Sequence, residues 1–283
     1  ERFAEFCGTK YAVGCSSGTD ALIMSLMALN IGPGTEVITT PFTFFATVES
    51  IIRVGATPVF VDINEKTFNI DTSKIESAIT DKTKAIIPVH LFGQPADINS
   101  ILDICKRYNL LLIEDCAQAH FSEWRNKKVG KFGIAGTFSF FPGKNLGAYG
   151  DAGAIISNDD KFAEKARMFA NHGALKKHHH KFEGINSRLD GLQAAILSVK
   201  LKYILQWTDL RIQHAKQYSE LLSGVDNIVT PATHQDAKHV FHLYVIRTQQ
   251  RDALQSHLTK NGISSGMHYP TPLPFLKAYN YLG

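Results

Sequence analysis

The sequence predicts an α/β protein in which helices flank a mostly parallel β-sheet, followed by a smaller C-terminal α+β domain. Short, almost continuously apolar runs alternate with helix-like stretches from about residue 15 to residue 157, as in strands that crossover helices cover on both faces. After residue 186 the pattern changes to a long amphipathic helix and isolated strand and helix signals. We therefore expect a large domain over residues 1–185 and a smaller one over residues 186–283.

Six apolar runs are expected to form strands of the large domain, with gaps long enough for crossover helices between several of them. They are residues 36–39, 58–61, 85–89, 110–113, 137–140 and 154–156. In the second region apolar residues recur at steps of three and four from Leu189 to Leu210, which predicts one long amphipathic helix. Residues 240–248 are expected to form a strand and residues 251–261 a helix.

The composition is that of an ordinary globular protein, with 283 residues of which 44% are hydrophobic. Thirty basic against 26 acidic residues give a net charge of +4, too small to favour a nucleic-acid partner. No apolar run approaches the roughly 18–20 residues of a membrane span. Four cysteines without paired spacing favour a reducing compartment, so we expect a cytoplasmic protein. Because the chain starts at Glu1 and ends without a helix stop, we expect truncation at both ends.

A lysine follows a Pro-Gly bend just after one of the predicted strands. Lys144 lies five residues after Ser139 in the run Ser139-Phe140-Phe141-Pro142-Gly143-Lys144-Asn145-Leu146-Gly147. An amine aimed into a pocket there is useful if it forms a Schiff base with a carbonyl, for which pyridoxal 5'-phosphate is the natural partner. Most lysines in such bends are solvated loop residues, so the assignment depends on companions elsewhere.

Two further segments supply such companions. The turn Ser17-Gly18-Thr19 directly precedes an apolar helix pattern, and the N–H groups and dipole of a helix start form a phosphate seat. Asp115 follows the strand-like run 110–113, where its carboxylate could meet a pyridine nitrogen and keep it protonated. Taken singly, each segment is better explained by simple helix capping or turn formation.

Together these runs resemble the DegT/DnrJ/EryC1/StrS family of pyridoxal-phosphate nucleotide-sugar aminotransferases, and the resemblance covers nearly the whole chain up to His268-Tyr269-Pro270. The motifs that carry it are Ser17-Gly18-Thr19-Asp20-Ala21-Leu22, Glu114-Asp115-Cys116-Ala117-Gln118-Ala119-His120, the run from Ser139 to Gly147, and Asn186-Ser187-Arg188-Leu189-Asp190 followed by Gln193-Ala194-Ala195. The resemblance implies the fold-type I aminotransferase architecture and a homodimer in which both subunits contribute to each site.

The resemblance also implies roles for individual residues. Lys144 would be the Schiff-base lysine and proton shuttle, and Asp115 the partner of the ring nitrogen. The other residues implied to bind the cofactor are Gly18, Thr19 and Ser139 at the phosphate, Phe44 and Gln118 at the ring, and Asn186 at the phosphate of the neighbouring subunit. Arg188, His268 and Tyr269 are implied to lie near the substrate. The alternatives are an ion pair of Arg188 with Asp190 or Glu183, and a turn histidine without a ligand at His268.

The implied reaction moves an amino group from glutamate to a keto group of a nucleotide-linked sugar, with pyridoxamine 5'-phosphate as the intermediate cofactor form. Relatives that act at C4 of the sugar often carry histidine where Phe141 stands, so C3 is favoured. A 4-keto sugar aminotransferase, a cofactor-dependent sugar dehydratase and a non-catalytic regulatory relative remain alternatives, although the dehydratases have histidine in place of Lys144.

Two features depart from the pattern. Phe121-Ser122-Glu123-Trp124 follows His120, where many relatives have glycine and a small residue, which predicts an altered pocket wall beside Asp115. His178, His179 and His180 lie in a basic run without the spacing or supporting carboxylates of a metal site, and we expect no functional metal.

Overall fold

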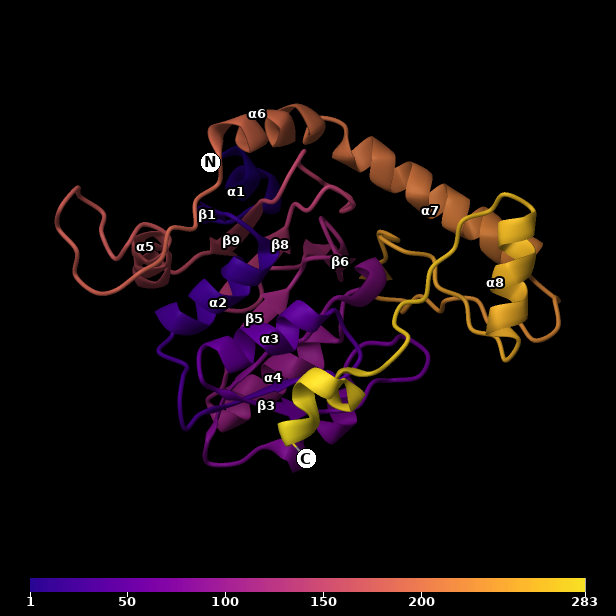
Figure 1. The fold of residues 1–283 in the computed structure, drawn as a ribbon, viewed down its shortest axis with the longest axis horizontal. Helices are drawn as coiled ribbons and strands as arrows, with labels where there is room; N and C mark the ends of the chain where they lie inside the picture. The colour runs from indigo at the N-terminus through magenta and orange to yellow at the C-terminus, as the bar shows by residue number, and fades with distance from the viewer. Residues whose placement is uncertain (283) are drawn as a thin grey trace.

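The computed structural model describes residues 1–282, and a seven-stranded sheet forms its centre (Figure 1). The strand order is β1-β9-β8-β5-β4-β2-β3. In chain order the strands are β1 (Tyr11–Cys15), β2 (Glu36–Thr39), β3 (Thr57–Phe60), β4 (Thr83–Ile86), β5 (Leu111–Asp115), β8 (Ala135–Ser139) and β9 (Gly153–Ser157). Only β9 runs antiparallel to its neighbours, β1 and β8. The predicted mostly parallel sheet is confirmed.

Helix α1 precedes the first strand, the other helices lie between strands or follow the last one, and three of them begin at a side-chain cap. The helices are α1 (Arg2–Cys7), α2 (Gly18–Ala28), α3 (Phe45–Arg53), α4 (Ile98–Tyr108) and α5 (Asp160–Phe169), with short 3₁₀ turns η1 (Thr72–Lys74), η2 (Glu76–Ala78) and η3 (Leu91–Gly93). The side chains of Ser17, Asp97 and Asp159 accept hydrogen bonds from the first turns of α2, α4 and α5. Such caps satisfy backbone N–H groups that have no partner within the helix.

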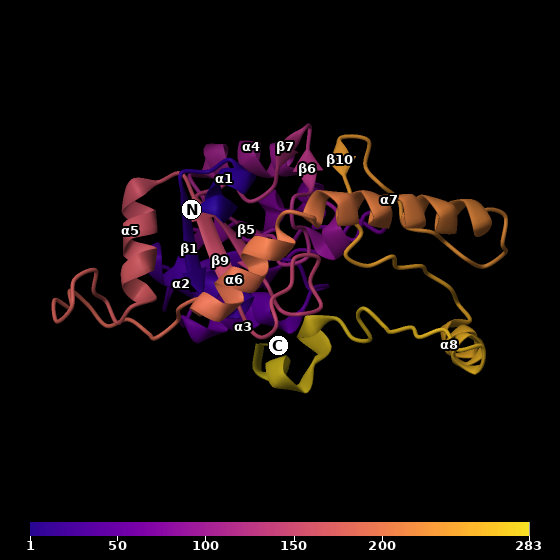
Figure 2. The ribbon, with the colours of Figure 1, turned by 90° about the horizontal axis from the view of Figure 1, so that it is seen from above.

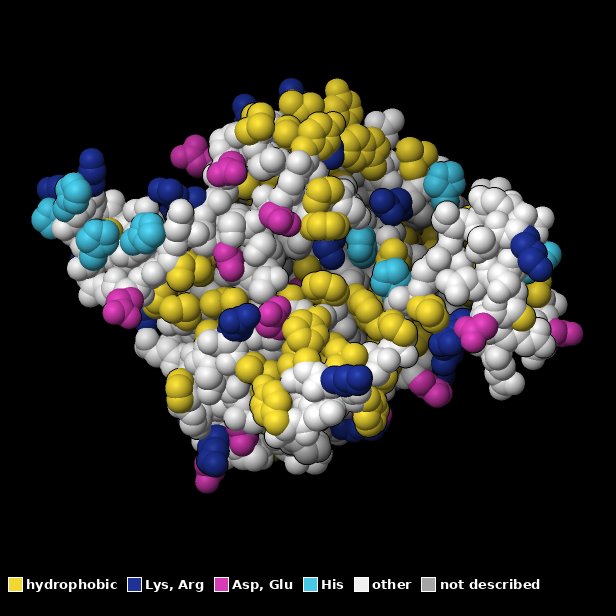
Figure 3. Space-filling model, in the orientation of Figure 1, with side chains coloured by type: hydrophobic (Ala, Val, Ile, Leu, Met, Phe, Trp, Pro, Cys, Tyr) yellow, Lys and Arg dark blue, Asp and Glu magenta, His cyan; other side chains and the backbone are white. Residues whose placement is uncertain are grey.

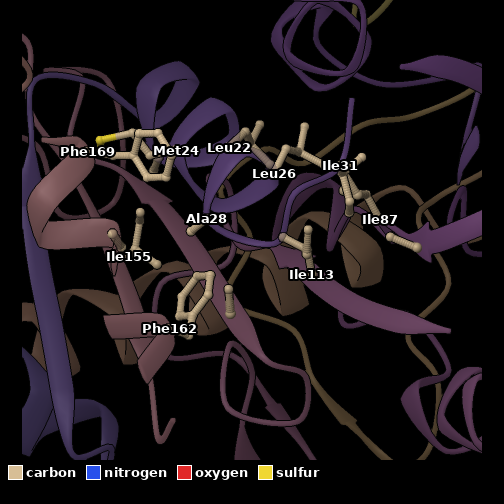
Figure 4. Packing of buried hydrophobic residues seen from close by; sticks show 14 of the residues in the cluster. Leu22, Met24, Leu26, Ala28, Ile31, Ile87, Ile113, Ile155, Phe162 and Phe169 are labelled. Carbon is tan, nitrogen blue, oxygen red and sulfur yellow. The ribbon is translucent and has the colours of Figure 1, made fainter. Parts of the chain in front are cut away.

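Successive residues of the central strands feed cores on opposite faces of the sheet. Ile113 of β5 packs into the core formed with α2 and α5, which Figure 4 shows from close by. Its neighbour Leu112 packs with Ile101 and Ile104 of α4 on the other face. This alternation is the pleat of a strand buried on both sides, and it explains why the strands read as continuous apolar runs.

The single long helix expected after residue 186 is wrong in its extent. Residues 186–190 are not helical, and two helices follow, α6 (Gly191–Lys200) and α7 (Ile204–Leu221). The face that this chain buries carries Leu197, Leu201 and Ile204. Most of the apolar stripe that suggested the helix is exposed instead, namely Leu192, Val199, Tyr203, Trp207 and Leu210. Periodicity identified the helix but could not tell which of two apolar faces the chain itself covers.

The strand expected over residues 240–248 is also wrong. Within residues 1–282 this segment forms one isolated bridge, between Val229 and Arg247, and joins neither sheet. Instead, the N–H groups of Val240 and Leu243 donate to the carbonyls of Gly93 and Phe92 in η3, at 3.0 and 3.3 Å. The helix expected at residues 251–261 is confirmed as α8 (Arg251–Lys260), which Figure 2 shows at the far end of α7.

The C-terminal segment returns to the central sheet. A small sheet joins β10 (Ala237–Lys238) to β6 (Glu123–Trp124) and β7 (Lys127–Lys128). The final turns η4 (Leu273–Phe275) and η5 (Lys277–Leu282) pack against α3, where Leu273 and Tyr279 contact Val48. The division into domains 1–185 and 186–283 stays a prediction. No helix within residues 1–282 is long and apolar enough to cross a membrane.

Candidate active site

A cavity of about 640 Å³ lies at the carboxyl ends of the parallel strands, where ligands bind in sheets of this kind. The residues predicted from sequence that line it are Gly18, Thr19, Phe44, Asp115, Gln118, Ser139, Lys144, His268 and Tyr269. They come from five separate stretches of the chain, and the fold brings them together. Asn186 and Arg188 are not among the described residues that line this cavity, and both are exposed.

One wall of the cavity is the N-terminus of α2. Ser17 accepts a hydrogen bond from the N–H of Asp20 at 3.0 Å, whereas the first N–H groups of a helix, here those of Gly18 and Thr19, have no partner within it. A Cβ atom at residue 18 would lie 2.6 Å from the Cβ of Ser139. Glycine is therefore required for the helix end and Ser139 to approach so closely. Exposed N–H groups, a helix dipole and a hydroxyl suit a phosphate group.

Asp115 ends β5 and is buried beside the cavity. Thr47 Oγ1 donates to its Oδ2 at 2.9 Å, and the N–H of Ala117 donates to its Oδ1 at 3.1 Å. Burial raises the pKa of this carboxyl above its usual value, although these hydrogen bonds and the charge of Lys144 act in the opposite direction. An additional cation placed against Asp115 would favour its ionised form, so the residue fits a protonated ring nitrogen.

Lys144 lies in the turn that follows β8, and its N–H donates to the carbonyl of Phe141 at 2.9 Å. Burial lowers the pKa of its amine, while the charge of Asp115 raises it. The side chain of the next residue, Asn145, is held at both amide atoms. Its Nδ2 donates to Val240 O, and its Oδ1 forms a hydrogen bond with His242 Nδ1, each at 3.2 Å. A partly desolvated amine on an anchored turn, close to the charge of an acid, is suited to nucleophilic and proton-transfer chemistry.

The lowered pKa of Lys144 predicts a pH-dependent cost to stability. A lysine whose pKa is lower in the folded than in the unfolded state destabilises the fold at every pH at which the unfolded amine is protonated. This loss of folding free energy disappears above the ordinary lysine pKa. Lys144→Met should therefore raise the melting temperature of the cofactor-free protein by a few degrees at neutral pH. The gain should shrink as the pH rises towards 10.5. Calorimetry across this pH range tests it, and a gain that is equal at all pH values would contradict it.

Gln118 and Tyr269 are joined across the cavity. Gln118 Oε1 accepts from the N–H of Phe92 at 2.7 Å, and its Nε2 donates to the Tyr269 hydroxyl at 2.8 Å. Burial raises the pKa of Tyr269 to about 12, so the phenol stays protonated. The predicted contact of Gln118 with the cofactor would use its second amide hydrogen. His268 lies next to this pair, and its pKa is lowered by burial.

Several residues at the site were not predicted from the sequence. Thr47, Asp151 and His242 line the cavity, but each stands in a segment that carried no recognisable motif. Thr47 could have been suspected only from its place on the helix that follows Phe44. The predicted effect of Phe121-Ser122-Glu123-Trp124 on the pocket wall beside Asp115 is wrong, because none of these four residues is among the described residues that line the cavity. Trp124 is buried in the small sheet instead and donates to Asn99 at 3.0 Å.

A buried carboxylate next to Asp115 holds a loop outside the cavity lining. Glu114, directly before Asp115, is fully buried and accepts hydrogen bonds from the N–H groups of Gly130, Phe132 and Gly133 at 2.7, 2.7 and 3.0 Å. His90 Nε2 lies 3.2 Å from its Oε2. Cys116 is close enough to complete a metal-like trio. However, burial raises the pKa of its thiol well above 9.0, and hydrogen bonds already engage the carboxylate oxygens and His90. We read the group as a structural support.

Glu114→Gln is expected to destabilise the protein by about 2–4 kcal/mol. Each carboxylate oxygen of Glu114 faces two donors, His90 Nε2 and the N–H of Gly130 at Oε2, and the N–H groups of Phe132 and Gly133 at Oε1. In either orientation of the glutamine amide, its nitrogen replaces one of these oxygens and leaves two donors without an acceptor. Urea denaturation of the cofactor-free protein measures the change. Glu76→Gln is the control, because Glu76 pairs with Arg107 at the surface and its loss should matter little. Equal stability of the two variants would contradict the structural role.

The fold and the cavity together define an enzyme of the aminotransferase class. The whole chain, residues 1–283, matches the model of the DegT/DnrJ/EryC1/StrS aminotransferase family. The protein belongs to this family.

Two curated relatives are identical to this chain at about half of the aligned positions. A protein of Geobacillus stearothermophilus named pleiotropic regulatory protein is 51% identical over 99% of this chain and 76% of its own length. The UDP-N-acetyl-3-dehydro-alpha-D-glucosamine 3-aminotransferase of Acidithiobacillus ferrooxidans is 46% identical over 95% of this chain and 73% of its own. The chain thus spans about three quarters of the length of these relatives.

Solved structures have the same fold. DesV of S. venezuelae, determined in complex with a ketimine intermediate, superimposes with a TM-score of 0.97 at 42% identity and covers 99% of this chain and 76% of its own. NtdA of Bacillus subtilis, determined with bound PMP, gives a TM-score of 0.90 at 35% identity over 98% of this chain and 65% of its own. The expected fold-type I aminotransferase architecture is confirmed.

Proposed function

We propose that this protein is a pyridoxal-phosphate-dependent aminotransferase that moves an amino group from glutamate to the C3 keto group of a nucleotide-linked sugar. The observation that carries the proposal is the arrangement of one cavity: a desolvated amine at Lys144, a buried acid at Asp115 and a phosphate seat at the start of α2. The cofactor and reaction agree with those named for the similar proteins.

The residues that line the cavity have separate roles in cofactor binding and proton transfer. When bound, pyridoxal phosphate supplies an electron-withdrawing ring that stabilises negative charge on the carbon beside the reacting nitrogen. Asp115 would keep the ring nitrogen protonated, and Gly18, Thr19 and Ser139 would bind the phosphate. Lys144 Nζ would accept the proton that the α-carbon of the amino donor releases and hold it for return to the reacting centre. Its lowered pKa favours the neutral amine that this transfer needs.

The identity of residue 141 supports the assignment of amination to C3 of the sugar. Phe141 lines the cavity three residues before Lys144 and offers no proton donor where relatives that aminate C4 often have histidine. The A. ferrooxidans relative, at 46% identity, is named a 3-aminotransferase.

With matched UDP- and dTDP-linked sugars and glutamate as donor, we expect amination of 3-keto sugars at least roughly tenfold faster than of 4-keto sugars. Mass spectrometry and NMR of the products measure the position of the new amine. Phe141→His tests the assigned residue, since it should narrow this preference, whereas Phe141→Leu should keep it. A product aminated only at C4 would overturn the preference for C3.

We further propose that the enzyme works as a homodimer with shared sites. The apolar stripe Leu192, Val199, Tyr203, Trp207 and Leu210 is exposed on α6 and α7, where hydrophobic side chains gather in Figure 3. Exposed apolar patches of this kind mark interaction surfaces. Asn186 and Arg188 lie outside the cavity of their own chain, as residues that serve a second subunit should. Four buried cysteines without disulfides agree with a cytoplasmic location.

The relative named as a regulatory protein supports one alternative, a protein that binds the cofactor without turnover. The panel of keto sugars also decides this point. A protein that takes up pyridoxal phosphate at Lys144 but aminates none of the 3-keto or 4-keto sugars would favour the regulatory role. A protein that stays colourless with the cofactor would contradict the proposed site itself.

A further inference from the structure

The segment between α5 and α6 alternates between inward and outward side chains. We call residues 185–189 the strap. Ser187 is fully buried, Ile185 and Leu189 are half-buried, and Asn186 and Arg188 between them are exposed. This is the period of two expected of an extended chain lying on a surface. The two residues that the shared site assigns to the other subunit are therefore the two that this chain turns away from itself.

The strap is fixed to its own subunit along its length. The N–H groups of Ile185 and Ser187 donate to the carbonyls of Phe169 and Ala170 at 2.8 and 3.1 Å. At its far end Leu189 packs on β1, where a Cβ atom at Gly14 would lie 2.7 Å from that of Leu189. Such anchoring leaves little freedom to the outward side chains.

One carboxylate connects the strap to the phosphate seat. Asp20 Oδ2 accepts a hydrogen bond from Ser187 Oγ at 2.7 Å and another from Ser16 Oγ. The N–H of Ser16 in turn donates to Ser187 Oγ at 3.2 Å. Asp20 lies in the first turn of α2, one residue after Thr19. Hydrogen bonds to a charged acceptor are the stronger kind in proteins, and the loss of one leaves the buried Ser187 hydroxyl without that acceptor.

We propose that the hydrogen bond between Asp20 and Ser187 is a positioning device that locks the strap to the phosphate seat and so presents Asn186 and Arg188 to the cavity of a second copy of this chain. Asp20 and Ser187 touch neither cofactor nor substrate of that site and act through their neighbours. The inference rests on the shared dimer proposed above. The new element is that the activity and cofactor affinity of one subunit's site depend on a hydrogen bond inside the other subunit.

Mixed dimers test the shared site first. A Lys144→Ala subunit and an Arg188→Ala subunit are each expected to be inactive or weak as homodimers. After mixing in equal amounts, half of the dimers should contain one complete site, which restores about a quarter of wild-type activity. If no activity returns, the shared site of the proposed function is contradicted, and the role of Ser187 falls with it.

The location of Ser187→Ala within the mixed dimer then tests the positioning device alone. Added to the Lys144→Ala subunit, which donates the strap to the complete site, it should lower the restored activity at least roughly tenfold, with a rise in KM for the sugar. Added to the Arg188→Ala subunit, which donates Lys144, it should have little effect. A purely structural role would lower both equally, and equal loss or no loss in both would overturn the proposal while leaving the shared site intact.

Cofactor affinity gives a readout independent of turnover. Absorbance titration of the cofactor-free homodimers with pyridoxal phosphate should show at least roughly tenfold weaker binding for Ser187→Ala and for Asp20→Asn. The matched control is Ser25→Ala, which removes a buried hydroxyl from the same helix, where Ser25 Oγ donates to Ala21 O at 2.7 Å. If Ser25→Ala weakens binding as much as Ser187→Ala, general destabilisation of α2 explains the effect and the proposal fails.

Discussion

Lys144→Ala is expected to lower turnover by roughly 10⁴-fold or more, because in the proposed site one atom, the Nζ nitrogen, would both attach the cofactor and move the proton. The variant should also lose the visible absorbance that the bound cofactor gives the native protein. Single-turnover assays with glutamate measure the first effect, and spectra of the protein mixed with pyridoxal phosphate measure the second.

Two variants show whether the chemistry of the amine, rather than its charge, is responsible. Lys144→Arg keeps the cation but offers a group that does not lose its proton at working pH, so it should be as inactive as the alanine variant. Lys10→Ala removes a surface lysine that pairs with Asp160 and should be fully active. Substantial activity in the arginine variant would show that charge alone suffices and would refute the role assigned to Lys144.

The sequence was informative where local chemistry and the fold demand the same residue. Continuous apolar runs identified the strands because both faces of the sheet are covered. The cofactor motifs lie at the carboxyl ends of strands, so the cavity could be anticipated from the order of Gly18, Asp115 and Lys144 along the chain.

Sequence patterns failed where a residue's role depends on what faces it. The stripe from Leu192 to Leu210 has the period of a buried helix face, but it is exposed in the single chain because α6 and α7 bury Leu197, Leu201 and Ile204 instead. Residues 240–248 have strand composition and no strand to pair with. Thr47 and His242 carry no local signal, because the fold alone places them beside Asp115 and Asn145.

Asp115→Asn is expected to lower kcat by roughly 10²–10³-fold while the fold stays intact. Asparagine has nearly the same shape and can still accept from the N–H of Ala117, and the hydroxyl of Thr47 can reverse its role to accept from the new amide. What is lost is the negative charge that, in the proposed site, would keep the ring nitrogen protonated. Thr47→Val is the graded control, since it removes one donor to Asp115 but leaves the charge, and its effect on kcat should be much smaller.

The pH dependence of cofactor binding separates the charge of Asp115 from its shape. Burial raises the pKa of Asp115 in the free protein, so the carboxyl takes up a proton at a higher pH than an ordinary aspartate. The protonated form cannot pair with a cationic ring nitrogen, and affinity for pyridoxal phosphate should therefore fall as the pH drops through this raised pKa. In Asp115→Asn that loss should vanish, leaving weak affinity at every acidic pH. A wild-type affinity that stays constant through the acidic range, or an equal decline in the variant, would show that Asp115 does not carry the charge that the ring requires.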